Sequence, residues 1–249
     1  YSGKDPNKYK LGLFSQVPLP NWRISYNGLS KIKWLQPVFT SISLTHGYNS
    51  TMTINSFQTN LNAEIDANGN TVKKDSLSGN FFANYAIPSV IVNEQFSPLI
   101  GVDITFKNNI LVRFDYKKSR TLTMSFSDYQ MIENKSTTIT AGLGYTIRGL
   151  KMPFKIKGKK PRLDNDLKFK CDVSYRDGVI INHRVDQFTP QITSGSTNIT
   201  VSPSIDYVIN NRINVRLFVD YNKTIPRIST GYPTTNVKGG LQLRLSLAQ

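Results

Sequence analysis

The sequence alternates between apolar and polar residues with a period of two, and this pattern returns in one segment after another. In the last segment, the odd positions from Val237 to Leu247 are apolar or glycine and the even positions from Lys238 to Ser246 are polar or glycine. Successive side chains of a strand point to opposite faces, so this period predicts about eleven strands, each with one apolar face. The strong segments cover residues 100–106, 110–117, 139–147, 167–175, 199–207, 213–221 and 237–247, and the weaker ones cover 38–48, 51–57, 120–127 and 179–186.

Composition limits the class of protein that these strands can build. Hydrophobic residues make up 39% of the 249 residues, which is lean for a globular core but sufficient if each strand needs only one apolar face. No window approaches the roughly 20 apolar residues of a membrane helix. The single cysteine, Cys171, excludes an internal disulfide framework. The net charge of +15 indicates a polyanionic neighbour, which can be nucleic acid, lipopolysaccharide or acidic lipid.

Alternation alone does not separate a membrane barrel from a soluble β-sandwich, so three further features decide the interpretation. Many segments are about ten residues long, which matches a membrane-crossing strand. The polar faces carry fixed charges of both signs, as a hydrated lumen would. Tyrosines stand at segment ends, where an aromatic girdle meets the membrane interface. We therefore predict an all-β fold, an antiparallel transmembrane β-barrel segment, with the sandwich as the alternative. The predicted interfacial aromatics are Tyr116, Tyr145, Tyr175, Tyr207 and Tyr221.

In the barrel interpretation, the charged residues of the polar faces line the lumen. A hydrated wall of mixed charge suits transport, because passing polypeptide finds little on it to adhere to. The alternative is that cross-strand ion pairs merely keep this side of the wall soluble, and the sequence does not separate the two. The predicted lumen-facing charged residues are Asp103, Arg113, Asp115, Lys117, Lys168, Lys170, Asp172, Asp206, Arg216, Asp220 and Arg244.

The lengths of the connections predict an orientation. Short turns are expected at 107–109, 176–178 and 210–211, and long loops at 148–166, 187–197 and 222–235. Short turns of bacterial barrels face the periplasm, which places the C-terminus there, provided that a hairpin forms at Lys118–Ser119. Without that hairpin, Lys118 and Arg120 would lie on the apolar face of one long strand. Residues 1–37 are expected to be an extended or loop segment leading into the barrel, and 38–247 the strands, with a long loop insertion at about 58–98.

We find no constellation of residues that predicts catalysis. His46 and His183 lie in strand patterns without partner ligands, and the glycine pairs at 142/144 and 239/240 precede no helix. We therefore expect no enzymatic activity, no cofactor, no catalytic residue and no metal site. A basic run in the 148–166 loop could hold lipopolysaccharide if it is extracellular or an acidic partner if periplasmic, or it could simply be solvated. That run comprises Lys151, Lys155, Lys157, Lys159, Lys160 and Arg162.

Several stretches resemble the C-terminal region of the SprA/Sov family, the giant outer-membrane translocons of the type IX secretion system in Bacteroidetes. Each stretch is moderately specific alone, and together they span nearly the whole chain in order. The matching stretches are 18–29 (PLPNWRISYNGL), 43–48 (SLTHGY), 87–90 (IPSV), 94–101 (EQFSPLIG), 116–120 (YKKSR), 142–147 (GLGYTI), 153–154 (PF), 175–177 (YRD), 184–187 (RVDQ), 206–210 (DYVIN), 216–220 (RLFVD), 226–230 (PRIST) and 233–236 (PTTN).

The resemblance implies a very large single-chain barrel of which this chain is the C-terminal arc. It implies export of folded proteins that bear a C-terminal secretion signal, and delivery of adhesins for gliding motility in some members. It also implies partners, namely outer-membrane lipid and lipopolysaccharide, the remaining strands of the translocon, a PorV-type barrel, a periplasmic plug protein and secreted cargo. The odd strand count and the lack of a signal peptide favour the same interpretation. A terminal aromatic, common in outer-membrane proteins, is not found at Leu247–Gln249.

Three other function classes remain open at this point. A passive porin or nutrient transporter would insert and conduct from this chain alone. A barrel enzyme acting on lipid or peptide would depend on His46 or His183. A soluble nucleic-acid binder would show salt-sensitive DNA binding without detergent, although the chain offers no recognised binding module and we expect no nucleic-acid partner.

Overall fold

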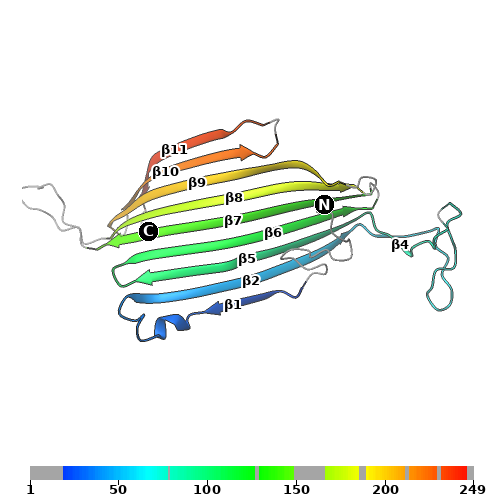
Figure 1. Cartoon of the computed structure of the whole chain (residues 1–249), viewed down its shortest axis with the longest axis horizontal. Helices are drawn as coiled ribbons and strands as arrows, with labels where there is room; N and C mark the ends of the chain where they lie inside the picture. The colour runs from blue at the N-terminus through cyan, green and yellow to red at the C-terminus, as the bar shows by residue number, and fades with distance from the viewer. Residues whose placement is uncertain are drawn as a thin grey trace, which may run out of the picture.

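The computed structural model describes residues 19–77, 79–126, 129–148, 166–184, 189–210, 213–228 and 231–245, and these form one large antiparallel β-sheet. Its nine strands follow one another in chain order, β1-β2-β5-β6-β7-β8-β9-β10-β11, as a single layer (Figure 1). A second sheet consists of the short strands β3 and β4, in the segment between β2 and β5. The all-β, antiparallel part of the prediction is therefore confirmed.

The strands of the main sheet are longer than the sequence segments that predicted them. A short 3₁₀ helix, η2 (Gly28–Lys31), lies between β1 and β2. Among the described residues, no helix is both long and apolar enough to cross a membrane. The strands are β1 (Trp22–Tyr26), β2 (Phe39–Asn55), β3 (Gln58–Thr59), β4 (Tyr85–Ala86), β5 (Ser89–Phe106), β6 (Ile110–Ser125), β7 (Gln130–Ile147), β8 (Leu167–Arg184), β9 (Gln191–Asn210), β10 (Ile213–Pro226) and β11 (Thr234–Leu245).

Two predicted turns are wrong. The hairpin expected at Lys118–Ser119 does not form, because β6 continues through both residues and pairs with β5 and β7 on either side. Likewise, Arg176 and Gly178 lie inside β8, paired with β7 and β9. The physical reason is that a charge on the apolar side of β6 finds its counter-charge on a neighbouring strand, as Arg120 finds Glu94, and needs no turn.

Regions expected to be loops are partly strands. β5 begins at Ser89, inside the expected 58–98 insertion, and β1 lies inside the expected 1–37 loop. β9 begins at Gln191 and β10 extends to Pro226, so the connections expected at 187–197 and 222–235 are shorter than predicted. These strands were missed because their alternation is interrupted by prolines, amides and charges, whereas pairing with long neighbours keeps them extended.

The chain reverses direction at two ends of the sheet. At the proximal end, the strands are joined by the connections 107–109, 148–166 and 211–212. At the opposite, distal end, they are joined by the connections 56–88, 126–129, 185–190 and 227–233. In Figure 1 the proximal end is on the left and β4 lies beyond the distal end on the right. The 148–166 connection therefore lies at the same end as the short turns, contrary to the prediction. The prediction failed because each of the two turns that do not form would have reversed the direction of the chain.

The sheet is open, and its two sides have no second layer against them in the described part of the chain. β1 and β11 form its edges. The buried apolar residues are few, namely Ile42, Tyr48, Val90, Val92 and Phe96, whereas Leu143 is 55% exposed and Leu241 is 70% exposed. A sheet with such an apolar face needs an apolar neighbour, because large contiguous apolar surfaces are unfavourable in water.

Candidate functional site: the two faces of the sheet

The strand register places all eleven predicted lumen residues on one side of the sheet, which we call the polar face. Residues directly opposite one another in an antiparallel pair share a face. One row across the sheet runs from Asp103 through Arg113 and Gly142 to Asp172, and another joins Lys168, Asp206 and Arg216. Whether this face lines a lumen stays a prediction.

Four of these charged residues form two cross-strand ion pairs with one another. The Nε atom of Arg113 lies 2.7 Å from Oδ1 of Asp103, and Nε of Arg216 lies 3.6 Å from Oδ1 of Asp206. Lys117, Lys168, Lys170 and Arg244 have no ion pair within the described part of the chain. The polar face therefore combines neutralised pairs with free cations, as a hydrated wall requires.

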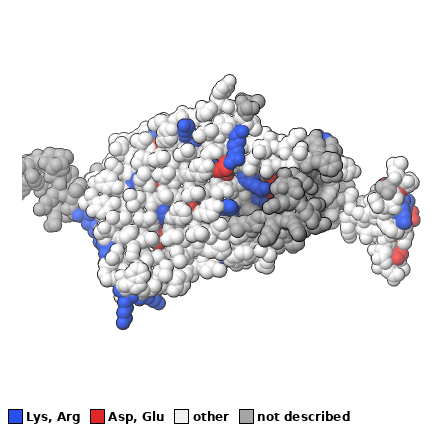
Figure 2. Space-filling model, viewed as in Figure 1, with Lys and Arg blue, Asp and Glu red and all other residues white. Residues whose placement is uncertain are grey.

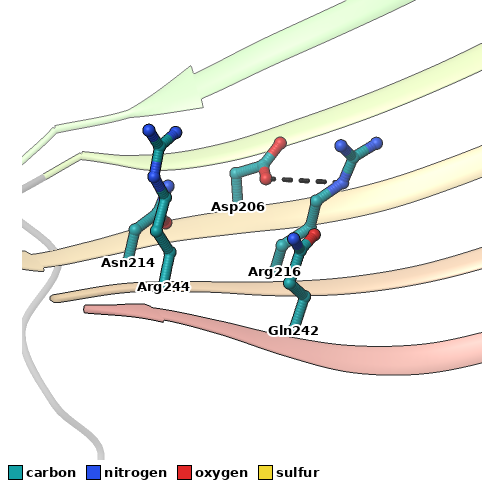
Figure 3. A pocket seen from close by; sticks show the side chains of 5 residues that line it. All are labelled: Asp206, Asn214, Arg216, Gln242 and Arg244. Atoms are coloured by element: carbon teal, nitrogen blue, oxygen red, sulfur yellow. Dashed lines mark ion pairs between the residues drawn. The ribbon is translucent and has the colours of Figure 1, made fainter. Parts of the chain in front are cut away.

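A cavity of about 230 Å³ opens on the polar face between β9, β10 and β11. The guanidinium groups of Arg216 and Arg244 extend to the same side there, with the carboxylate of Asp206 between them (Figure 3). The amide oxygen of Asn214 is buried without a hydrogen-bond partner among the described residues. Two arginines and one aspartate leave one net positive charge, which can hold a small anionic group but offers no nucleophile or general base. The fifth residue of its lining is Gln242.

The opposite side of the sheet carries an uninterrupted apolar band at its proximal half. The band consists of five cross-strand rows, which on β8 correspond to Leu167, Phe169, Cys171, Val173 and Tyr175. The eight residue steps from Leu167 to Tyr175 span about 27 Å at about 3.4 Å per residue. In the described chain between β5 and β9, no charged side chain lies on this face within these rows. We call this surface the apolar band.

The other strands complete these rows with residues of the same kind. Figure 2 shows a face whose left, proximal part is mostly white with small scattered blue and red spots, and whose larger blue and red patches lie nearer the middle. A shallow depression of about 340 Å³ lies in the band, with Leu143, Phe169, Cys171 and Leu217 in its lining. The remaining strands contribute Ile100, Val102, Ile104, Ile110, Val112, Phe114, Tyr116, Ile139, Ala141, Leu143, Tyr145, Ile199, Val201, Pro203, Ile205, Tyr207, Val215, Leu217, Val219, Tyr221, Val237, Leu241 and Leu243.

The five predicted interfacial tyrosines lie at the two margins of the apolar band. Tyr116 and Tyr175 are both opposite Ile139, in the row nearest the distal end, and Tyr221 lies one row inside it. Tyr145 and Tyr207 lie near the proximal end, opposite Ile110 and Leu167. Two aromatic margins on either side of an apolar strip are the arrangement found at membrane interfaces.

From the distal tyrosine row to the distal end, the same face carries charged side chains, and we call this surface the charged belt. The carboxylate of Glu94, only 2% exposed, accepts hydrogen bonds from the Tyr48 hydroxyl at 2.8 Å and from Nε of Arg120 at 2.9 Å. Glu133 lies 2.8 Å from Lys135 and 3.3 Å from Nε2 of His183. Asp177 pairs with Arg227. The belt consists of Glu94, Lys118, Arg120, Glu133, Lys135, Asp177, His183, Lys223 and Arg227.

Three groups of the belt region have shifted pKa values, namely Tyr48, Asp177 and Arg227. Burial raises the pKa of the Tyr48 hydroxyl, and its hydrogen bond to Glu94 raises it further. The hydrogen bond from Arg227 lowers the pKa of Asp177 below its ordinary value. The belt as a unit was missed by the sequence analysis, although Lys118 and Arg120 were recognised as charges on an apolar side. The sequence did contain a signal for the belt. Glu94, Glu133 and Asp177 each place a charge at an apolar position of the alternation, as Lys118 and Arg120 do, but on three other strands.

The contacts of the histidines and glycines indicate structural roles. The Nδ1 atom of His46 lies 2.7 Å from the Leu99 carbonyl oxygen, and its ring stands 5.8 Å from that of Phe96. A Cβ atom at Gly142 would lie 2.5 Å from Oδ1 of Asp172, so glycine leaves room for that side chain. Among the described residues, no group of three or more His, Cys, Asp or Glu side chains could hold a metal ion. The predicted basic run, Lys151, Lys155, Lys157, Lys159, Lys160 and Arg162, lies outside the described residues.

Comparison with family models and curated proteins assigns no family to this chain. Neither the protein-family models nor the curated proteins include one that matches this chain. The inference of function therefore rests on the chain's own two faces.

Proposed function

We propose that this chain forms part of the wall of an outer-membrane β-barrel that conducts proteins. The observation that carries the proposal is the apolar band: a strip about 27 Å long on one face of a single-layer sheet, uncharged between β5 and β9, with a charged face directly behind it. Outer-membrane barrels present an apolar belt of about 25 Å to lipid and a polar surface to the lumen.

The band suits lipid for energetic reasons. In the hydrocarbon region, each backbone N–H and C=O must be bonded within the protein, and the central strands of this sheet are paired on both sides. Leu143, Val173 and Leu241 are each at least two-fifths exposed in the isolated chain. Lipid contact removes this surface from water, at about 25 cal/mol for each Å² buried.

The edges of the sheet support an arc of a wall rather than a complete barrel. β11 leaves a 12-residue edge unpaired in the described chain, and β1 covers only five residues of β2. Unpaired edges of this length need partner strands, above all in lipid. The remaining strands of a larger translocon would provide them. The resemblance to the SprA/Sov family makes this chain the C-terminal arc, in the outer membrane of a Bacteroidetes species.

The mechanism follows from the polar face. Ion pairs such as Arg113–Asp103 and the unpaired Lys168, Lys170 and Arg244 keep water on the wall, so a folded cargo protein slides past a hydrated surface. Charges of both signs discourage any one cargo surface from binding tightly. A PorV-type barrel, a periplasmic plug and lipopolysaccharide are the partners that the resemblance supports. The C-terminus is proposed to be periplasmic, which would place the 148–166 connection in the periplasm as well.

The test has two parts. Purified chain refolded into planar lipid bilayers should not form stable channels, whereas a passive porin or nutrient transporter would conduct. The protein expressed from its complete gene should fractionate with the outer membrane, and its deletion should retain proteins with C-terminal secretion signals in the periplasm. Stable channels from this chain alone would replace the translocon by a porin. Recovery of the complete gene product in plain buffer as a monomer would overturn the membrane assignment.

A further inference from the structure

The charged belt begins at the row of the distal tyrosines, where Lys223 lies on β10, and this change marks a level on the sheet. Tyr116 and Tyr175 share one cross-strand row, and Lys118 and Asp177 share the next. The two rows are about 7 Å apart along the strands. The strands do not end there, since β6 and β8 each continue for nine residues past these tyrosines.

We propose that the first two rows of the charged belt, which hold Lys223 and Lys118, lie at the level of the lipid headgroups, and that these two lysines bind lipid phosphates there. The distal part of the sheet then projects beyond the bilayer. This inference rests on the proposed function, because it assumes that the apolar band faces lipid.

The balance of charge identifies these two lysines. Within the described residues, the belt holds five cations (Lys118, Arg120, Lys135, Lys223 and Arg227) and three carboxylates, Glu94, Glu133 and Asp177. Each carboxylate has one of the cations as an ion-pair partner, namely Arg120, Lys135 and Arg227 respectively. Five minus three leaves Lys118 and Lys223, neither of which has an ion pair in this part of the chain.

Both lysines stand where a headgroup phosphate would be. Lys223 is opposite Ile199, in the same row as Tyr175, and Lys118 is in the next row. The Nζ atom of Lys118 lies 5.6 Å from the centre of the Tyr116 ring, so its alkyl stem follows the aromatic margin. A lysine beside an interfacial tyrosine can keep its stem on apolar surface and place its ammonium group among phosphates.

The apolar residues in the last two rows of this face are too few to form a membrane span. On this face they make only two rows, those of Val92, Leu122 and Ile181, and of Val90 and Met124. Two rows cover about 7 Å, far less than a hydrocarbon core of about 30 Å. Glu133 and His183 also lie in these rows. The bilayer therefore fits the proximal half of the strands and not the distal half.

The level of the boundary can be measured with spin labels. The protein expressed from its complete gene, with Cys171→Ser, would carry one label at a time through Val173→Cys or Ile181→Cys, with Ser174→Cys on the polar face as the control. In vesicles of phosphatidylcholine and phosphatidylglycerol, the label at 173 should be exposed to oxygen dissolved in the lipid, and the labels at 174 and 181 should not. Lipid exposure at both 173 and 181 overturns the boundary but preserves the proposed function. Water exposure at 173 overturns both.

The lysines are tested by the lipids that the protein retains. The Lys118→Gln/Lys223→Gln double variant should lose enrichment of phosphatidylglycerol over phosphatidylcholine in native mass spectrometry, by about five-fold for each lysine removed. The matched control is Lys168→Gln/Lys170→Gln, which removes the same charge from the polar face. Equal enrichment in the two double variants would overturn the phosphate assignment, even where the spin labels support the boundary.

Discussion

The proximal and distal halves of the sheet are built from the same strands but distribute their charges in opposite ways. In the proximal half, charges such as Asp103, Arg113 and Asp172 lie on the polar face, and the other face is the apolar band. In the distal half, Glu94, Arg120 and Glu133 lie on the face that the band occupies, and the polar face carries mainly Ser, Thr, Asn and Gln.

The comparison shows that one strand can carry an apolar surface and a charged surface on the same face without a turn between them. Alternation reports which residues share a face, but it does not report what that face touches. β8 alternates from Leu167 to Tyr175 with apolar residues on the band side, and then places Asp177 and His183 on that same side. Four predictions test this contrast between the two halves, and they are given in order of decreasing expected effect.

Arg120→Ala should produce the largest loss of stability. It leaves the carboxylate of Glu94 buried without its principal counter-charge, which typically destabilises a protein by about 3–5 kcal/mol. The measurement is urea unfolding of the complete gene product in lipid vesicles. Replacing both residues by methionine should restore much of the loss, because the uncompensated charge is then removed. A loss below about 1 kcal/mol for Arg120→Ala would mean that the pair is not buried.

Val173→Arg should destabilise the membrane-inserted protein by about 2–4 kcal/mol, because it places a cation in the apolar band. The neighbouring substitution Ser174→Arg, on the polar face, is the matched control and should cost much less. The same unfolding assay measures both. Equal effects of the two substitutions would contradict the assignment of the faces.

The Asp177–Arg227 ion pair should stabilise the protein only above a certain pH. The pKa of Asp177 is lowered in the folded chain, so its contribution is present above the unfolded pKa of about 3.9 and is lost as the pH falls through the folded pKa. The pair is partly exposed, and we expect less than about 1 kcal/mol. Melting temperatures of wild type and Asp177→Asn should differ at pH 7, and the difference should shrink as the pH falls below about 3.9. A difference that is constant with pH would exclude the ion pair as its source.

Chemical labelling of Cys171 is expected to have the smallest effect on the protein. Its thiol lies in the middle row of the apolar band, so a membrane-impermeant maleimide should not label it in vesicles. A cysteine introduced by Asp172→Cys, on the polar face, should react in a Cys171→Ser background. Rapid labelling of Cys171 in sealed vesicles would place the band in water.

Much of each face could be predicted from sequence, whereas the ends of the strands could not. The eleven charged residues and the five tyrosines were assigned to faces by period two, and the register agrees with that grouping. The hairpin at Lys118–Ser119 was wrong because the cost of a charge on an apolar face depends on its neighbour. Glu94 lies 26 residues before Arg120, and no local pattern joins them. β1 and the first part of β5 were missed for the related reason that pairing holds them extended.

The sequence by itself determined that this protein is built of strands and which residues of a strand share a face, because the direction of successive side chains is a local property of extended backbone. Only the tertiary structure decided how long each strand runs, at which end of the sheet each connection lies, and where charges cross to the apolar side. These depend on cross-strand pairing and on counter-charges far away in the chain, such as Glu94 for Arg120 and Arg227 for Asp177.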